Sequence, residues 1–186
     1  ARLYNMVEEL LDFSRLQNGR LKMTCRPLDL VAELTDAVLF CEARIQREGL
    51  VLVYNEPEEM IPVYADPDRL RQVFINILDN AIKYSGDSPH IQITAEERNG
   101  SVIIRITDNG IGIEEEHLAH IFDKFYRVSN SKRPPVRGYG IGLFYVKTMI
   151  HMHNGTIRVE SQPGKGSCFI ITLPQTHERQ EIDIIG

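Results

Sequence analysis

Residues 66–84 read DPDRLRQVFINILDNAIKY. Asp66 can cap a helix with its side chain, and Pro67 suits a first helical position, so the pair predicts that a helix begins here. This helix is expected to run to about Tyr84 and to end at Ser85-Gly86. Its apolar residues form one broad side that a core must cover, and they are Leu70, Val73, Phe74, Ile77, Leu78, Ala81 and Ile82.

Polar residues recur at spacings of three and four on the other side of this helix, and they are Arg69, Gln72, Asn76, Asn80 and Lys83. A solvated face is the simplest interpretation. Asparagine is a poor mid-helix residue, however, because its side chain competes for backbone hydrogen bonds. Two asparagines one turn apart therefore suggest a functional role. Asn76 and Asn80 can offer carbonyl oxygens to Mg²⁺, and Lys83 and Tyr84 can reach phosphate oxygens.

Two glycine-rich loops follow, Asp108–Gly112 and Gly138–Leu143. In the first loop, the carboxylate at the end of a predicted strand can accept a hydrogen bond from an exocyclic amine of a ligand, while the backbone passes close to the flat ring of that ligand. An ordinary tight turn has the same residues and is the alternative. The second precedes a predicted helix, whose N–H groups and dipole can meet phosphates. The second loop does not have the spacing of a dinucleotide-binding fingerprint, and Gly164-Lys165-Gly166-Ser167 lacks the earlier glycine of a Walker loop.

A basic stretch lies between the two loops. Residues 122–127 read FDKFYR, and residues 128–137 contain almost nothing to bury. We expect a mobile lid in which Phe122 and Phe125 serve as anchors, while a solvated surface loop remains the alternative. The basic side chains that such a lid can gather round phosphates are Arg127, Lys132, Arg133 and Arg137.

The rest of the chain alternates short strand and helix patterns. Strands are expected over 21–28, 51–54, 90–97, 101–107, 156–160 and 167–173, and helices over 31–47, 114–119 and 141–152. Hairpin-joined strands and few helices indicate an α+β, two-layer sandwich with a mixed sheet covered on one face by helices. Residues 175–186 are expected to be a C-terminal tail.

Residues 1–19 predict a further helix whose apolar stripe is wider than one exposed helix needs. It either packs on its own domain or belongs to a truncated two-helix element, and the absence of a capping signal at the start favours the second. The chain is therefore expected to be a fragment of a longer protein.

The composition is that of a globular protein, with a formal net charge of −5 that disfavours nucleic acid as a partner. Cys25, Cys41 and Cys168 are widely separated, which indicates a reducing, cytoplasmic compartment. No apolar run approaches the ~20 residues of a membrane helix, although a longer parent protein could be anchored.

Five motifs in a fixed order resemble the N, G1, F, G2 and G3 boxes of sensor histidine kinases. They are Asn76-x-x-x-Asn80-x-x-Lys83-Tyr84, Asp108-x-Gly110-x-Gly112, Phe122-x-x-Phe125-Tyr126-Arg127, Gly138-x-Gly140-x-Gly142-Leu143 and Gly164-x-Gly166. The resemblance covers residues 20–174, and residues 1–19 resemble the end of the second helix of the dimerisation and phosphoacceptor hairpin. It implies a Bergerat ATP-binding fold with a mixed five-stranded sheet, as in gyrase, Hsp90 and MutL.

The same resemblance implies the roles of individual residues. Asp108 would bind the adenine amine, and Asn80 with Asn76 would hold Mg²⁺. Lys83, Tyr84 and Arg127 would contact ATP, and Asn76, Lys83 and Arg127 would act in catalysis. The remaining nucleotide-binding residues would be Gly110, Gly112, Ile113, Tyr126, Gly138, Gly140, Ile141, Gly142, Leu143 and Thr172.

The ATPase relatives carry a glutamate where this chain has Asn76, and an amide cannot accept a proton from water. We therefore expect slow hydrolysis and transfer of the γ-phosphoryl group to a histidine on a missing hairpin helix, for relay to a response regulator. None of the six histidines here has the acceptor setting, so the fragment should be a monomer that does not phosphorylate itself, from a homodimeric parent. A nucleotide-sensing module without catalysis and a Bergerat-type ATPase are the alternatives. Phe144 follows the loop Gly138–Leu143, at a position where the family that this chain resembles usually has a small residue.

Overall fold

The computed structural model describes residues 2–128 and 140–176. Its main element is a five-stranded sheet with the order β2-β4-β5-β7-β6. The strands span Val51–Asn55 (β2), His90–Arg98 (β4), Ser101–Asp108 (β5), Thr156–Gln162 (β6) and Gly166–Pro174 (β7). Only the β2–β4 pair is parallel, so the sheet is mixed, as the sequence predicted.

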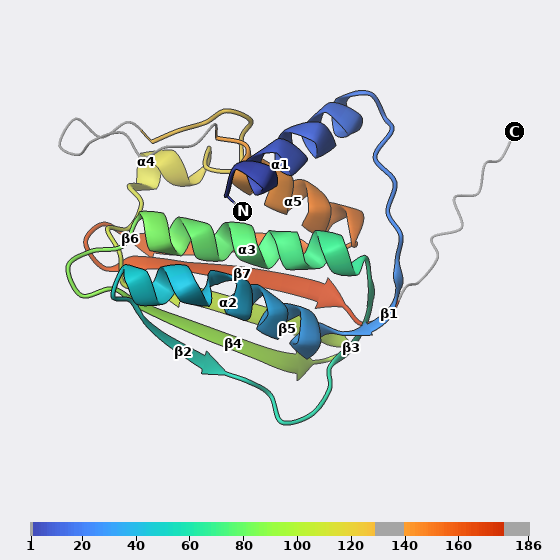
Figure 1. Cartoon of the computed structure of the whole chain (residues 1–186), viewed down its shortest axis with the longest axis horizontal. Coiled ribbons are helices and arrows are strands. Elements are labelled where there is room, and N and C mark those ends of the chain that lie inside the picture. The colour runs from blue at the N-terminus through green and yellow to red at the C-terminus, as the bar shows by residue number, and fades with distance from the viewer. Residues whose placement is uncertain (1, 129–139, 177–186) are drawn as a thin grey trace, which may run out of the picture.

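Helices α2 (Leu30–Arg47), α3 (Pro67–Lys83) and α5 (Gly142–Met152) lie on one face of this sheet, and Figure 1 shows α3 between the other two. The short α4 (Glu115–Leu118) follows the loop after β5, and α1 (Arg2–Gln17) lies beside α5. The predicted two-layer architecture is confirmed. Leu70, Phe74 and Leu78 of α3 are fully buried against the sheet, which fixes the rotation of the helix about its axis.

Asp66 fixes the start of α3, as its sequence position predicts. Its carboxylate accepts hydrogen bonds from the backbone N–H groups of Asp68 and Arg69 at the helix start and of Thr24 in the preceding connection. Its own N–H donates to Nε2 of the buried His153 at 3.1 Å. The first turn of α3 is thus held to the segment before α2 and to the end of α5.

One expected strand is much shorter in the structure. Residues 20–25 are irregular, and the strand expected over 21–28 is reduced to β1 (Arg26–Asp29). It pairs with β3 (Pro62–Ala65), which the sequence analysis missed, in a separate two-stranded sheet. Both strands have four residues and contain a proline that cannot donate a ladder hydrogen bond, so their sequence signal is weak.

The expected turn between β4 and β5 is present. Asn99 and Gly100 both have positive φ, as the tight β4–β5 hairpin requires. Within residues 2–128 and 140–176, no helix combines the length and the apolar composition that crossing a bilayer requires. Of the tail, Gln175 donates from its backbone N–H to the carbonyl oxygen of Gly100, and residues 177–186 lie outside the described part.

Candidate nucleotide site

Asn76 on the polar side of α3 is buried, with 7% of its surface exposed. Its Oδ1 accepts a hydrogen bond from Gln72 Nε2 at 2.9 Å, and its Nδ2 donates to the carbonyl oxygen of Gly142 at 3.4 Å. Gly142 is the first residue of α5. A solvated face is therefore excluded at this position, because the amide ties the middle of α3 to the start of α5.

Asn80, one turn further on, differs from Asn76 in its exposure and its hydrogen bonding. Its side chain is half-buried and forms no hydrogen bond with any residue that the structure describes. No described residue therefore occupies the lone pairs of its amide oxygen, which suit an incoming ligand. No group of three His, Cys, Asp or Glu side chains within residues 2–128 and 140–176 is arranged to hold a metal. The Asn80 oxygen nevertheless fits Mg²⁺, which usually takes one or two protein ligands and completes its shell with phosphates and water.

Lys83 ends α3 and is held by an acidic neighbour one turn back. Its Nζ lies 2.7 Å from Oδ2 of Asp79, whose other oxygen pairs with Arg44 from α2. The Lys83 side chain is 18% exposed. The ammonium thus remains close to the end of α3, where it can reach a ligand bound beside Asn80.

Tyr84 follows Lys83 and caps the C-terminal end of α3. Burial raises the pKa of the Tyr84 hydroxyl, and the positive charge of Arg127 acts against that rise. Arg127 is thus near enough for its charge to act on the hydroxyl of Tyr84, the residue that follows Lys83.

Asp108 ends β5 and carries a carboxylate whose pKa is raised by burial. Its Oδ1 accepts a hydrogen bond from the N–H of Gly110 at 2.8 Å, and the Ser167 backbone N–H offsets part of the burial effect. No ion pair with Asp108 occurs among the described residues. A half-buried carboxylate without a cation is suited to accept a hydrogen bond from a ligand amine.

The glycines of the first loop have a packing reason that the sequence analysis did not identify. A Cβ atom on Gly110 would lie 2.2 Å from the carbonyl oxygen of Tyr84. One on Gly112, which has φ +71°, would lie 2.0 Å from the carbonyl oxygen of Gln162. Gly110 thus lets the loop pass directly against the end of α3, which places Asp108 near Tyr84.

The second loop meets the segment Phe122–Arg127 in the same way. Gly140 has φ +72°, and a Cβ there would lie 2.6 Å from the carbonyl carbon of Phe125. Its carbonyl oxygen accepts from the N–H of Phe125 at 2.9 Å. Tyr126 is held from α4, where its Oη lies 2.6 Å from Nδ1 of His117. The Phe122 ring meets the core ring of Phe169 edge-on, whereas the Phe125 side chain is exposed.

The remaining predicted residues divide into three groups. Ile141 is buried, and Leu143 is partly buried against the core. The N–H of Ile113 is already bonded to Ser161 Oγ at 2.8 Å. Gly138 and the lid residues 129–137, including Lys132, Arg133 and Arg137, lie outside the described residues.

Thr172 does not lie with the other site residues, and its inclusion requires correction. It is paired with Ile103 and Thr156, five positions along β7 from Ser167, which is the residue opposite Asp108. At about 3.3 Å per residue that is roughly 17 Å. Ser167 is buried and its Oγ lies 2.8 Å from Ser161 Oγ. The motif Gly164-x-Gly166 immediately before Ser167 could have identified it.

Comparisons with known proteins agree with this geometry. Residues 65–177 match the family described as "Histidine kinase-, DNA gyrase B-, and HSP90-like ATPase". The chain belongs to this ATPase family. The match contains α3, both glycine loops and β7, and therefore the whole candidate site.

Among curated proteins, the sensor protein SrrB of Staphylococcus aureus is 36% identical over 94% of the chain, and the sensor protein RprX of Bacteroides fragilis is 35% identical over 93%. The chain spans only 30% and 34% of the length of these two relatives. It corresponds to the ATP-binding catalytic part of such sensor kinases.

Solved histidine kinases share the fold. The catalytic domain of ThkA, 28% identical, superposes with a TM-score of 0.72 over 83% of this chain and 100% of that domain. Acinetobacter baumannii AdeS is 29% identical with a TM-score of 0.72, covering 94% of this chain and 79% of AdeS. Another structure contains ThkA bound to its response regulator TrrA.

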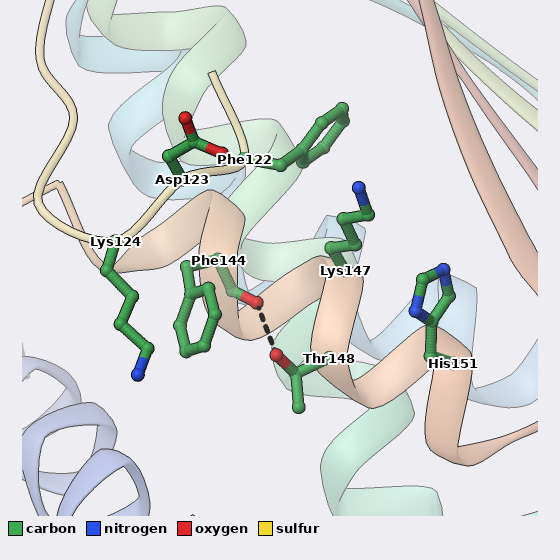
Figure 2. Close-up of a pocket in the computed structure, with 7 residues that line it drawn as sticks. All are labelled: Phe122, Asp123, Lys124, Phe144, Lys147, Thr148 and His151. Carbon is green, nitrogen blue, oxygen red and sulfur yellow. Dashed lines mark hydrogen bonds between the residues drawn. The ribbon is translucent and has the colours of Figure 1, made fainter. Parts of the chain in front are cut away.

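The chain also has a cavity of about 470 Å³ beside α5. Figure 2 shows Phe144, Lys147, Thr148 and His151 along that side of the helix, with Phe122, Asp123 and Lys124 at one end. Asn76, Asn80 and Asp108 do not line it. The candidate nucleotide site is therefore defined by α3 and the two loops and not by this cavity.

Proposed function

We propose that this chain binds Mg²⁺-ATP at the end of α3 and is the phosphoryl-transferring domain of a sensor histidine kinase. The γ-phosphoryl group would pass to a histidine on the hairpin of the parent kinase, a homodimer, and then to the receiver domain of a response regulator. The observation that carries the proposal is the convergence of Asn80, Lys83, Tyr84 and Arg127 with Asp108 around one helix end.

Each group then has a definite task in the bound state. Asp108 accepts a hydrogen bond from the amine of the adenine ring, which a purine without that amine cannot donate. Asn80 would be the principal protein ligand of Mg²⁺, and Asn76 would contribute its second lone pair while holding α5 in place. The metal, when bound, supplies charge neutralisation to the phosphates.

Lys83 and Arg127 add positive charge where the transferred group accumulates negative charge in a loose transition state. Neither Asn76 nor Asn80 can act as a base, and we assign no proton acceptor for water at this position. The acceptor imidazole is itself a nucleophile and needs no such base. Transfer to a histidine is therefore favoured over hydrolysis.

The test mixes the purified chain with Mg²⁺, γ-labelled ATP and a separately produced phosphoacceptor hairpin of the parent kinase. We expect acid-labile label on the hairpin, little released phosphate without it, and no transfer by Asn80→Ala. ATP binding without labelled hairpin would instead identify a nucleotide-sensing module. Rapid steady-state hydrolysis by the chain alone would identify an ATPase.

A further inference from the structure

Asp79 is an acidic residue of α3 with a separate cation for each carboxylate oxygen. Oδ2 lies 2.7 Å from Nζ of Lys83, one helical turn further on, and Oδ1 pairs with Nη1 of Arg44 from α2. The Asp79 and Lys83 side chains are 27% and 18% exposed. Water therefore reaches both groups only in part, and the pair is screened less than one on an open surface.

Asp79 thus holds Lys83 and Arg44 at once, with one cation on each carboxylate oxygen.

The two contacts of Asp79 serve different purposes. The one with Arg44 joins α2 to α3, and Arg44 also lies 3.2 Å from Glu48 at the end of its own helix. The one with Lys83 lies within α3 at the i,i+4 spacing and so does not depend on α2. Loss of Arg44 should therefore weaken helix packing and leave the Lys83 ammonium where it is.

Lysine is a flexible side chain with three donor hydrogens on its ammonium. With one donor bound to Asp79, two remain for phosphate oxygens. A side chain already held near its bound position loses less freedom when the ligand arrives. Asn80 lies three positions before Lys83 and therefore on the same part of the helix surface.

We propose that Asp79 is a positioning residue, which fixes the Lys83 ammonium for the phosphates of ATP. The inference rests on the proposed function, because Lys83 has this task only if ATP binds at the end of α3. A carboxylate that merely joins α2 to α3 would have the same contacts but a different effect on binding.

The experiment measures Mg²⁺-ATP affinity by calorimetry, and thermal unfolding in parallel, for the 186-residue chain. The variants are Asp79→Asn, Lys83→Met, the double variant and Arg44→Met. Each of the first two should weaken binding about tenfold, and the double variant should bind about as weakly as Lys83→Met alone, since Asp79 acts through Lys83. Arg44→Met should lower the unfolding temperature yet bind within about twofold of the original chain.

Several results would overturn the inference. Unchanged or tighter binding by Asp79→Asn would mean that the carboxylate does not help Lys83. Losses that multiply in the double variant would show independent action, and an equal loss in Arg44→Met would reduce Asp79 to a helix-packing residue. If the unmodified chain bound no Mg²⁺-ATP, the proposed function itself would fail, which is a distinct outcome.

Discussion

Asp12 of α1 and Arg69 of α3 form an ion pair in which Asp12 is only 6% exposed. Next to it, the Phe13 ring contacts the rings of Phe125 and Phe144 edge-on, with centroid distances of 5.5 and 6.0 Å. Helix α1 therefore docks on its own domain with one side. Its other side keeps an apolar stripe exposed, formed by Val7, Leu10 and Leu11. A partner helix of the kind that the sequence predicts would cover this stripe.

Asp12→Asn should release α1 from the domain. Removal of one partner from a buried ion pair leaves an uncompensated charge and costs about 3 kcal/mol. A single helix of this length is marginal in water once its contacts are lost. Hydrogen exchange should therefore show loss of amide protection in residues 7–17 while α3 stays protected.

Arg15→Gln is the matched control for that experiment. Arg15 also pairs with Asp12, at 3.3 Å, but its side chain is 51% exposed. Exposed pairs contribute only about 0.2–1 kcal/mol, so α1 should remain protected. Equal exchange in Asp12→Asn and in the unmodified chain would show that the aromatic contacts alone hold the helix.

Substitution of Asn80 should weaken ATP binding, whereas substitution of Asn76 should lower the stability of the fold. Asn80→Ala removes an amide without a protein partner among the described residues, so it should weaken Mg²⁺-dependent ATP binding by about tenfold or more and leave unfolding nearly unchanged. Asn76→Ala removes two hydrogen bonds and should cost about 1–2 kcal/mol of unfolding free energy. Calorimetry with and without Mg²⁺, with urea unfolding, measures both effects. Equal affinity of Asn80→Ala and the unmodified chain would remove Asn80 from the site.

Much of this structure could be predicted because local signals agree with the fold. Asp66-Pro67 starts α3 where its capping chemistry requires, and the Asn99-Gly100 turn joins β4 to β5. The order of the motifs also predicts that Asn80, Lys83 and Asp108 belong to one site.

The sequence does not predict a residue's environment where that environment depends on tertiary contacts. No local pattern shows that Asn76 is buried by Gln72 and Gly142, or that Asp79 binds cations from two helices. The inclusion of Thr172 instead of Ser167 was an error of strand position, since only the register of β5 and β7 shows which residue lies opposite Asp108.

Gly110→Ala should destabilise the fold and not merely the site. Its Cβ would overlap the carbonyl oxygen of Tyr84, which is backbone and cannot rotate away. Relief requires displacement of the loop from the end of α3, at about 1–3 kcal/mol. Gly142→Ala is the control, because the nearest atom to its Cβ is Asn76 Nδ2 at 3.9 Å, an ordinary contact. Similar thermal unfolding of the two variants would contradict this assignment of Gly110.

Asp108→Asn should abolish ATP binding while changing the free energy of unfolding by less than about 1 kcal/mol at pH 7. Burial raises the pKa of the folded Asp108 carboxyl above its ordinary value of 3.8. The folded protein therefore holds this proton more tightly than the unfolded chain does. The associated stability is fully present below pH 3.8 and is lost as the pH rises through the raised folded value.

Asparagine does not titrate. The free energy of unfolding of the original chain, compared with that of Asp108→Asn, should therefore fall with rising pH and then level off. Urea unfolding from about pH 3 to about pH 7 measures the difference, with exposed Asp87→Asn as the control for a general charge effect. A relative stability that rises with pH would show that an attractive partner, and not burial, governs this carboxylate. In that case Asp108 would be a structural anion, and the adenine contact would have to be assigned to another residue.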